Sequence, residues 1–171
     1  ISFFVGADFV LTFQEDRDGD SLEPVRQRLR QSRGRIRHVG TDYLLYELFD
    51  SVIEGYFPIL ETFGDRLDEL DRETDYRDTG RKLVEIHRLR SELLFLRRIV
   101  WPHRDALQTM LRAGHPPIRD ETLIYLRDSY DHMVQLIDIV EIYRETCADM
   151  RDFLYAKLGN RTNEVMRMLT V

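Results

Sequence analysis

The sequence predicts a mainly α-helical fold that begins with the remnant of a β-hairpin and ends in one very long helix. Three observations predict it. Residues 119–171 contain no proline and one glycine, Gly159, and apolar side chains recur along them every seven residues. Residues 41–73 and 81–112 carry similar apolar seams. Residues 1–14 instead hold two short runs rich in strand-forming residues. The chain therefore combines one short β-element with long packed helices.

The first element is the hairpin, in which runs 1–5 and 9–13 flank a turn that contains glycine. A short helix is predicted from about Leu22 to Ser32, with Pro24 in its first turn, where proline is tolerated. Two strands alone are only marginally stable in water. We therefore expect residues 1–40 to be the C-terminal remnant of a larger α/β domain.

The second element is a long αα-hairpin that spans residues 41–118. Its first arm has the seam Leu45, Phe49, Val52, Tyr56, Ile59, Phe63 and Leu70. Its second arm has the seam Ile86, Leu89, Leu93, Leu96, Val100, Leu107 and Met110. Pro58 and Pro102 are expected to bend the two arms. The polar stretch 71–80 forms the tip between them.

The third element is the stalk helix, residues 119–171, about 75 Å long at 1.5 Å per residue. Its apolar seam consists of Leu126, Met133, Leu136, Val140, Tyr143, Cys147, Met150 and Leu154. A second stripe holds only carboxylates: Asp131, Asp138, Glu145 and Asp152. The last turns place Val165, Met166, Met168, Leu169 and Val171 around most of the helix surface. The stalk therefore has an apolar face, an acidic face and an apolar end, and it should extend beyond the hairpin.

Composition narrows the classes of partner. The chain has 31 acidic and 25 basic residues, a net charge of -6, which argues against nucleic acid and suits cations. The single cysteine, Cys147, lies on the apolar seam, so it is expected to be a small buried residue and excludes a disulfide framework. No apolar run of 18 residues is present, so we expect a soluble chain. Because it opens in mid-pattern with ISFFV, we expect an internal piece of a longer protein.

Two residues four positions apart are the best candidates for chemistry. Asp128 and His132 lie on one face of the stalk helix, and Asp50 lies at the edge of the seam of the preceding hairpin. Two carboxylates suit Mg²⁺, whereas an imidazole favours Co²⁺ or Zn²⁺. A surface Asp-His pair without a ligand is the alternative that spacing leaves open. Catalytic motifs such as G-x-S-x-G, a P-loop or HExxH are absent, so no catalytic residue is predicted.

Six arginines crowd into residues 26–37. Such a segment can bind nucleic acid or acidic lipid. Aromatic residues are not interleaved with the arginines, and the chain as a whole is acidic. We therefore favour a solvated face in which the arginines form salt bridges.

Four segments together resemble the CorA magnesium transporters: TDYLLYELFDSVIEGYFPILE, LRRIVWPHRD, YLRDSYDHMVQLIDIVE and NRTNEVMRMLTV. The resemblance extends over essentially the whole chain. It implies a funnel-shaped homopentamer with a cytosolic α/β domain, a helical hairpin and a stalk helix that continues into the first membrane span. Residues 1–40 would end the α/β domain, 41–118 would be the hairpin, and 119–171 the stalk, with the span itself absent.

The resemblance also implies roles for individual residues. Asp128 matches an aspartate that holds a regulatory cation between subunits, and His132 and Asp50 match companions of a second regulatory site. Asp152 matches an acidic ring in the stalk. Asn163, Met166 and Leu169 match pore-lining positions at the cytosolic mouth. The spacing of Asp152, Asn163 and Met166 along one helix face agrees with these roles.

We therefore expect the cytosolic sensor and stalk of a channel-type transporter for Mg²⁺, with Co²⁺ as a second ion, on the cytoplasmic face of the inner membrane. It would be a homo-oligomer, pentameric in the full-length protein, without catalysis and without nucleic acid as a partner. The alternatives are a soluble helical metal-binding regulator, a zinc transporter of the same superfamily and a structural coiled-coil adaptor. The Gly-Met-Asn loop by which the resembled family selects Mg²⁺ would lie beyond Val171.

Overall fold

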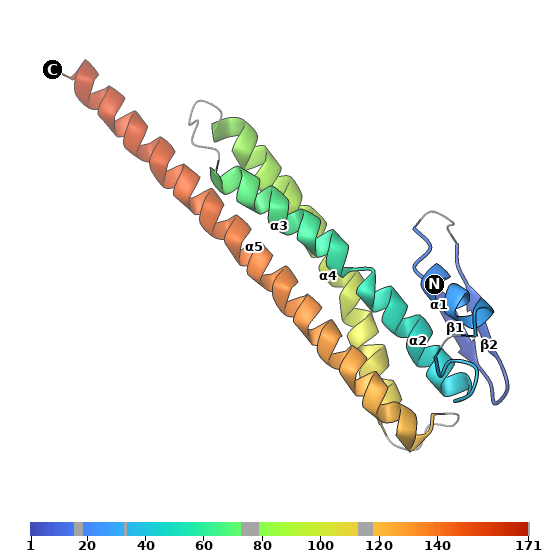
Figure 1. Ribbon diagram of the computed structural model, residues 1–171. Helices are drawn as coiled ribbons and strands as arrows, with labels where there is room; N and C mark the ends of the chain where they lie inside the picture. The colour runs from blue at the N-terminus through green and yellow to red at the C-terminus, as the bar shows by residue number, and fades with distance from the viewer. Residues whose placement is uncertain (16–18, 33, 73–78, 113–117, 171) are drawn as a thin grey trace. The chain divides into compact units, whose positions relative to one another are not determined.

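A computed structural model describes residues 1–15, 19–32, 34–72, 79–112 and 118–170 (Figure 1). The side chains of Arg161, Glu164 and Val165 lie outside this description. The chain forms two compact units. The first contains Ile1–Pro58 and Val100–Leu136, and the second contains Ile59–Ile99 and Ile137–Val171. The architecture is mainly α-helical with one small antiparallel sheet, as the sequence predicts.

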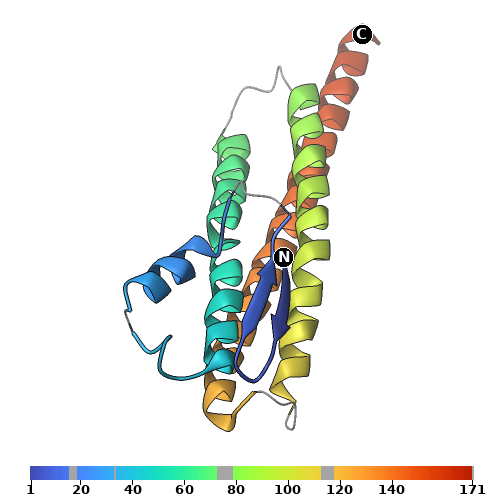
Figure 2. The same cartoon turned by 90° about the vertical axis from the view of Figure 1, so that its right-hand side faces the viewer.

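The predicted hairpin is present at the start of the first unit. Strands β1 (Ser2–Val5) and β2 (Val10–Phe13) pair antiparallel, with Ser2 opposite Phe13 and Val5 opposite Val10 (Figure 2). One face of the sheet packs on the helices, where the rings of Phe3 and Phe49 are 6.0 Å apart. This contact supplies the apolar burial that two isolated strands lack.

Helix α1 (Glu23–Arg30) completes the small core of the first unit. Pro24 lies in its first turn, where the missing N–H costs no helical hydrogen bond. A cluster of buried apolar residues joins α1 to the next helix: Leu22, Val25, Ile36, Tyr43 and Leu48. At about 25 cal/mol per Å² of apolar surface, burial of this kind stabilises the unit.

The first arm of the predicted αα-hairpin is two helices, which corrects the single bent helix expected over 41–73. Helix α2 (Thr41–Glu54) ends at Gly55, and α3 (Phe57–Arg72) begins two residues later. Pro58 is accommodated in the first turn of α3 because it has no N–H to offer inside a longer helix. The new start changes which side chains are buried. Ile59 is 45% exposed, contrary to the predicted seam, whereas Leu60 is 3% exposed.

Helix α4 (Thr79–Leu111) runs through both units and keeps Pro102 in its interior, as the sequence predicts. Its predicted seam positions from Ile86 to Leu107 are buried. Within the second unit, Arg66 of α3 pairs with Glu85 at 2.5 Å and with Glu92 at 2.8 Å, both on α4. Of the predicted tip 71–80, residues 73–78 lie outside the described residues, as do residues 113–117 before the last helix.

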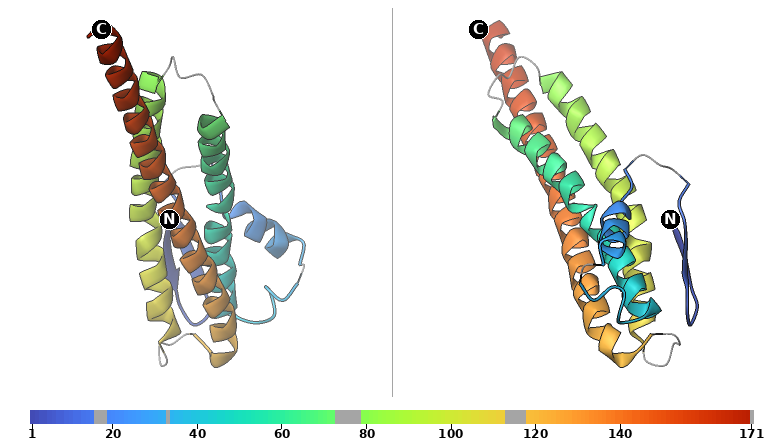
Figure 3. Two further views of the ribbon diagram at one scale, coloured as in Figure 1. Left: turned by 90° about the vertical axis from the view of Figure 1, so that its left-hand side faces the viewer. Right: turned by 45° about the vertical axis from the view of Figure 1, so that its right-hand side comes forward.

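Helix α5 (Asp120–Leu169) is a single uninterrupted helix of 50 residues, and Figures 1 and 3 show it without a break. Its seam is confirmed, since Leu126, Met133, Val140 and Cys147 have no exposed surface. The acidic stripe from Asp131 to Asp152 is solvent-exposed.

Candidate metal half-site

Two helices of the first unit carry the candidate metal ligands. Asp50 belongs to α2, and Asp128 and His132 belong to α5, four residues apart on one face. The hydroxyl of Ser129, which has no exposed surface, donates a hydrogen bond of 2.7 Å to Oδ1 of Asp50. This bond holds the Asp50 carboxylate against α5. Its donor, Ser129, directly follows Asp128 in the sequence.

Burial and nearby carboxylates set the electrostatic environment of Tyr46. Burial raises the pKa of Tyr46 far above its ordinary value, and the charges of Asp50, Glu47 and Asp128 raise it further. Two of these carboxylates, Asp50 on α2 and Asp128 on α5, therefore act on the same hydroxyl. Asp50 is half-buried and Asp128 is exposed, so both remain accessible to an ion.

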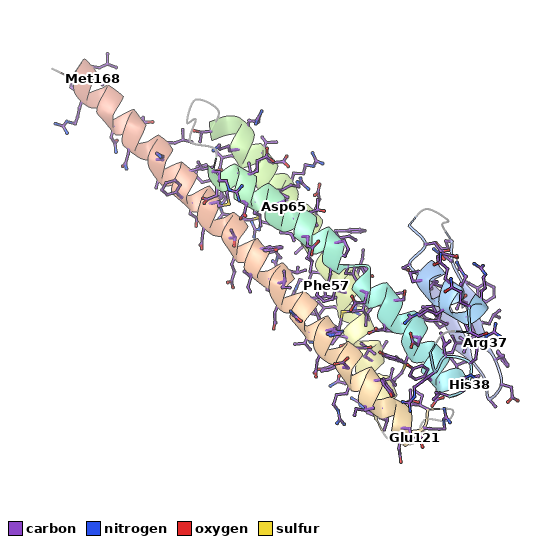
Figure 4. All side chains as sticks on the ribbon, viewed as in Figure 1. Arg37, His38, Phe57, Asp65, Glu121 and Met168 are labelled. Carbon is purple, nitrogen blue, oxygen red and sulfur yellow. The ribbon has the colours of Figure 1, made fainter. Side chains whose placement is uncertain are left out.

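His132 lies on the same face with an unsatisfied ring nitrogen. Its Nδ1 is buried and forms no hydrogen bond, and the nearest carboxylate oxygen, Oε1 of Glu54, is 3.8 Å away. The ring of Phe57, labelled in Figure 4, meets the imidazole edge-on at a centroid distance of 6.3 Å. A buried polar atom without a partner is costly, so this nitrogen marks a place where a further partner would be stabilising.

The chemistry of these side chains fits a divalent cation, but their number does not complete a site. Oxygen ligands from carboxylates suit Mg²⁺, and the imidazole adds affinity for Co²⁺. Among the described residues, however, no three His, Cys, Asp or Glu side chains are grouped so that they could hold a metal ion. We call Asp50, Asp128 and His132 the candidate half-site.

A second carboxylate cluster, which the sequence analysis did not identify, lies on the same two helices. We call Asp42, Arg119 and Thr122 the Asp42 cluster. Asp42 is 2% exposed and accepts hydrogen bonds from the backbone N, Nε and Nη2 of Arg119 at 3.1, 3.1 and 2.8 Å, and from Oγ1 of Thr122 at 2.6 Å. Burial alone would raise the pKa of Asp42, but these bonds outweigh it and lower the pKa to about 2. The sequence signal that could have pointed to this cluster is the position of Asp42, an acidic residue in the first turn of α2.

The predicted stalk and pore positions lie on the part of α5 that belongs to the second unit. Asp152 is exposed and pairs with its neighbour Arg151 at 2.8 Å. Asn163, Met166 and Leu169 are exposed, and Figure 4 labels Met168 near the end of the same helix. Their roles as an acidic ring and as pore lining stay predictions.

The arginine-rich segment forms salt bridges, as predicted. Arg26 pairs with Asp20 and Glu23, Arg30 pairs with Glu23, and Arg28 pairs with Glu47 at 2.8 Å. Arg33 lies outside the described residues. Arg35 and Arg37 instead donate to the hydroxyl of Tyr125 and to the carbonyl of Leu29, so three of the five described arginines form salt bridges.

Comparison with known proteins identifies the family. The family described as CorA-like Mg²⁺ transporter protein matches residues 1–171. A cobalt/magnesium transport protein CorA from Thermotoga maritima is 39% identical over the whole chain, which covers 48% of that protein. A putative metal ion transporter of Bacillus subtilis is 33% identical over the whole chain, which covers 53% of it.

Solved structures show the same fold. The structure described as the complete structure of the CorA magnesium transporter from Methanocaldococcus jannaschii superposes with a TM-score of 0.83 at 23% identity, over 98% of this chain and 53% of that one. The chain thus spans about half the length of the relatives it matches. Within the described residues no helix is long and apolar enough to cross a membrane. The family match covers residues 1–171, and the Thermotoga maritima protein is 39% identical over the same length. The chain therefore belongs to the CorA-like Mg²⁺ transporter family.

Proposed function

We propose that this chain is the cytosolic sensor and stalk of a channel-type transporter for Mg²⁺, with Co²⁺ as a second ion, at the cytoplasmic face of the inner membrane. The observation that carries the proposal is the half-site on α2 and α5. Asp50 of α2 accepts a hydrogen bond from Ser129, the residue next to Asp128 on α5, and Nδ1 of His132 has no hydrogen-bond partner among the described residues. A half-site suits a cation shared between subunits, because a second copy of the chain would supply the missing ligands.

The regulatory mechanism is electrostatic. The exposed carboxylates of Asp131, Asp138 and Glu145 would repel their counterparts when stalk helices of a homo-oligomer, proposed to be a pentamer, lie side by side. A cation held between subunits at Asp128 offsets that repulsion and stabilises the closed assembly. When cellular Mg²⁺ falls, the cation dissociates and the subunits separate. This works only if the cation binds the closed state more tightly than the open one.

The second part of the proposal concerns the C-terminal part of α5. Asn163, Met166 and Leu169 would line the cytosolic mouth of the pore, and Asp152 would form an acidic ring below it. An amide at the start of an apolar pore can hydrogen-bond the water shell of an ion. Leucine at position 163 removes this contact, so Asn163→Leu should lower cation uptake without lowering the melting temperature.

The test of the sensor is Mg²⁺ uptake by the intact transporter in vesicles whose internal Mg²⁺ is varied. Asp128→Ala should keep transporting at internal concentrations that close the wild type. The matched control is Asp149→Ala, an exposed carboxylate of α5 outside the half-site and outside the acidic stripe; it should close as the wild type does. If Asp128→Ala closes at the wild-type concentration, the sensor assignment is wrong.

A further inference from the structure

Between Leu126 and Leu154, the buried face of α5 carries one fully buried polar side chain, Ser129. The seam positions on either side of it are Leu126, Met133 and Leu136, and all three have no exposed surface. Ser129 occupies the position equivalent to Leu136 one heptad earlier and is equally buried. An apolar side chain would pack better at such a position, so the hydroxyl has a cost that something else must offset.

The hydrogen bond to Asp50 offsets that cost. Oγ of Ser129 lies 2.7 Å from Oδ1 of Asp50, and this is the only hydrogen bond that the described residues make to the Asp50 carboxylate. The bond occupies one oxygen and leaves Oδ2 without a hydrogen-bond donor. A buried hydroxyl can thus hold a carboxylate in one orientation and leave half of it available to an ion.

We propose that Ser129 is a positioning residue that orients the Asp50 carboxylate for cation binding and joins α2 to α5 at the half-site. The inference rests on the proposed function. A ligand that is already oriented loses less conformational freedom when the ion binds. Partners that orient metal ligands typically change metal affinity by about 10- to 100-fold when they are removed. Because a half-site gains little from each ligand, the expected effect is at the lower end, about tenfold.

The experiment is a titration of the 171-residue chain with Co²⁺ alone and with Mg²⁺ alone, followed by NMR at the backbone amides of residues near Asp50 and Asp128. The amide signals separate this site from weak binding elsewhere on an acidic chain. Ser129→Ala should weaken Co²⁺ binding about tenfold. Ser129→Thr, which keeps the donor hydroxyl, should bind Co²⁺ with nearly wild-type affinity.

Thr122→Val provides a matched control. Thr122 is also a fully buried hydroxyl of α5, and it donates at 2.6 Å to Asp42, a buried carboxylate of α2. Its removal should lower the melting temperature and leave Co²⁺ affinity unchanged. This separates a general weakening of the α2 and α5 contact from a specific effect on the ligand.

A double mutant separates the inference from the proposed function. If Ser129 acts through Asp50, adding Ser129→Ala to Asp50→Ala should change Co²⁺ affinity by less than about twofold. The reason is that the carboxylate that Ser129 orients is already absent. If Asp50→Ala and Asp128→Ala both retain wild-type affinity, the proposed function fails and this inference fails with it. If those two variants weaken binding but Ser129→Ala does not, only the role of Ser129 is overturned.

Discussion

Two carboxylates on helix α2, eight residues apart, meet α5 in opposite ways. Asp42 is almost completely buried and its oxygens accept four hydrogen bonds from Arg119 and Thr122. Asp50 is half-buried and accepts one hydrogen bond, from Ser129. The first carboxylate has no capacity left for a ligand, and the second has an oxygen to spare.

This difference shows how one helix can carry both a carboxylate that stabilises the fold, Asp42, and a candidate metal ligand, Asp50. A buried charge is stable only when its partners satisfy it, which Arg119 does for Asp42. The hydrogen-bond partner of Asp50, Ser129, is neutral and leaves the charge of the carboxylate in place. The Asp42 cluster should therefore control stability, and the half-site should control the response to cations.

The largest effect should come from removing the satisfied carboxylate. Asp42→Ala leaves the hydrogen-bond donors of Arg119 and Thr122 without their acceptor, so the free energy of unfolding should fall by about 3 kcal/mol. Asp50→Ala should cost only about 1 kcal/mol, since it removes one hydrogen bond. Urea unfolding of the chain measures both, and equal losses would show that the two carboxylates do not differ in this way.

A smaller effect should appear in the pH dependence of stability. The pKa of Asp42 is about 2 in the folded chain, against its ordinary value of 3.8. The lowered pKa means that the folded state favours the charged carboxylate, so its stabilisation is complete above about pH 4 and is lost as the pH falls towards 2. The difference corresponds to roughly 2 kcal/mol.

The free energy of unfolding should be measured between about pH 5 and about pH 2.5, because proton binding to Asp42 is linked to folding in this range. The wild type should lose this stabilisation as the pH falls. Asp42→Asn cannot titrate, so its stability should decline less over the same range. Parallel curves for the two proteins would contradict the assignment of the shift to Asp42.

The smallest effect concerns the half-site in the chain alone. With ligands from one copy only, we expect Mg²⁺ to bind with a Kd of about 1 mM or weaker. At about 10 mM Mg²⁺ the stabilisation is then about 1.4 kcal/mol or less.

Sedimentation of the chain with and without about 10 mM Mg²⁺ should show no pentamer that is stable in the absence of the cation. A stable, cation-independent pentamer would mean that the hairpin and stalk seams suffice for assembly.

The sequence predicts what depends on local periodicity. The seam of α5 follows from heptad spacing, and its members from Leu126 to Leu154 are buried or nearly so. The same reasoning misplaced Ile59, because it assumed that the helical register continues through Gly55 and Pro58. A break that restarts the helix changes the buried face, and periodicity read across it gives the wrong residues.

Contacts between distant residues were not predictable from periodicity. Asp42 and Arg119 are 77 residues apart, and nothing in the spacing of either helix pairs them. Ser129 was visible as a polar gap in an apolar seam, but its partner, Asp50, lies 79 residues away. Asp50, Asp128 and His132 were selected by their spacing and seam position as well as by resemblance, and they lie on two adjoining helices of the first unit.

The most direct test of the cation half-site is the Mg²⁺-dependent shift in melting of the intact transporter. At a hundredfold excess of Mg²⁺ over its Kd, binding to the closed state alone should stabilise the wild type by about 2.7 kcal/mol. Asp128→Ala should lose this stabilisation, whereas Asp42→Asn should melt at a lower temperature and retain it. A full Mg²⁺-dependent shift in Asp128→Ala would contradict the assignment of the half-site as the sensor.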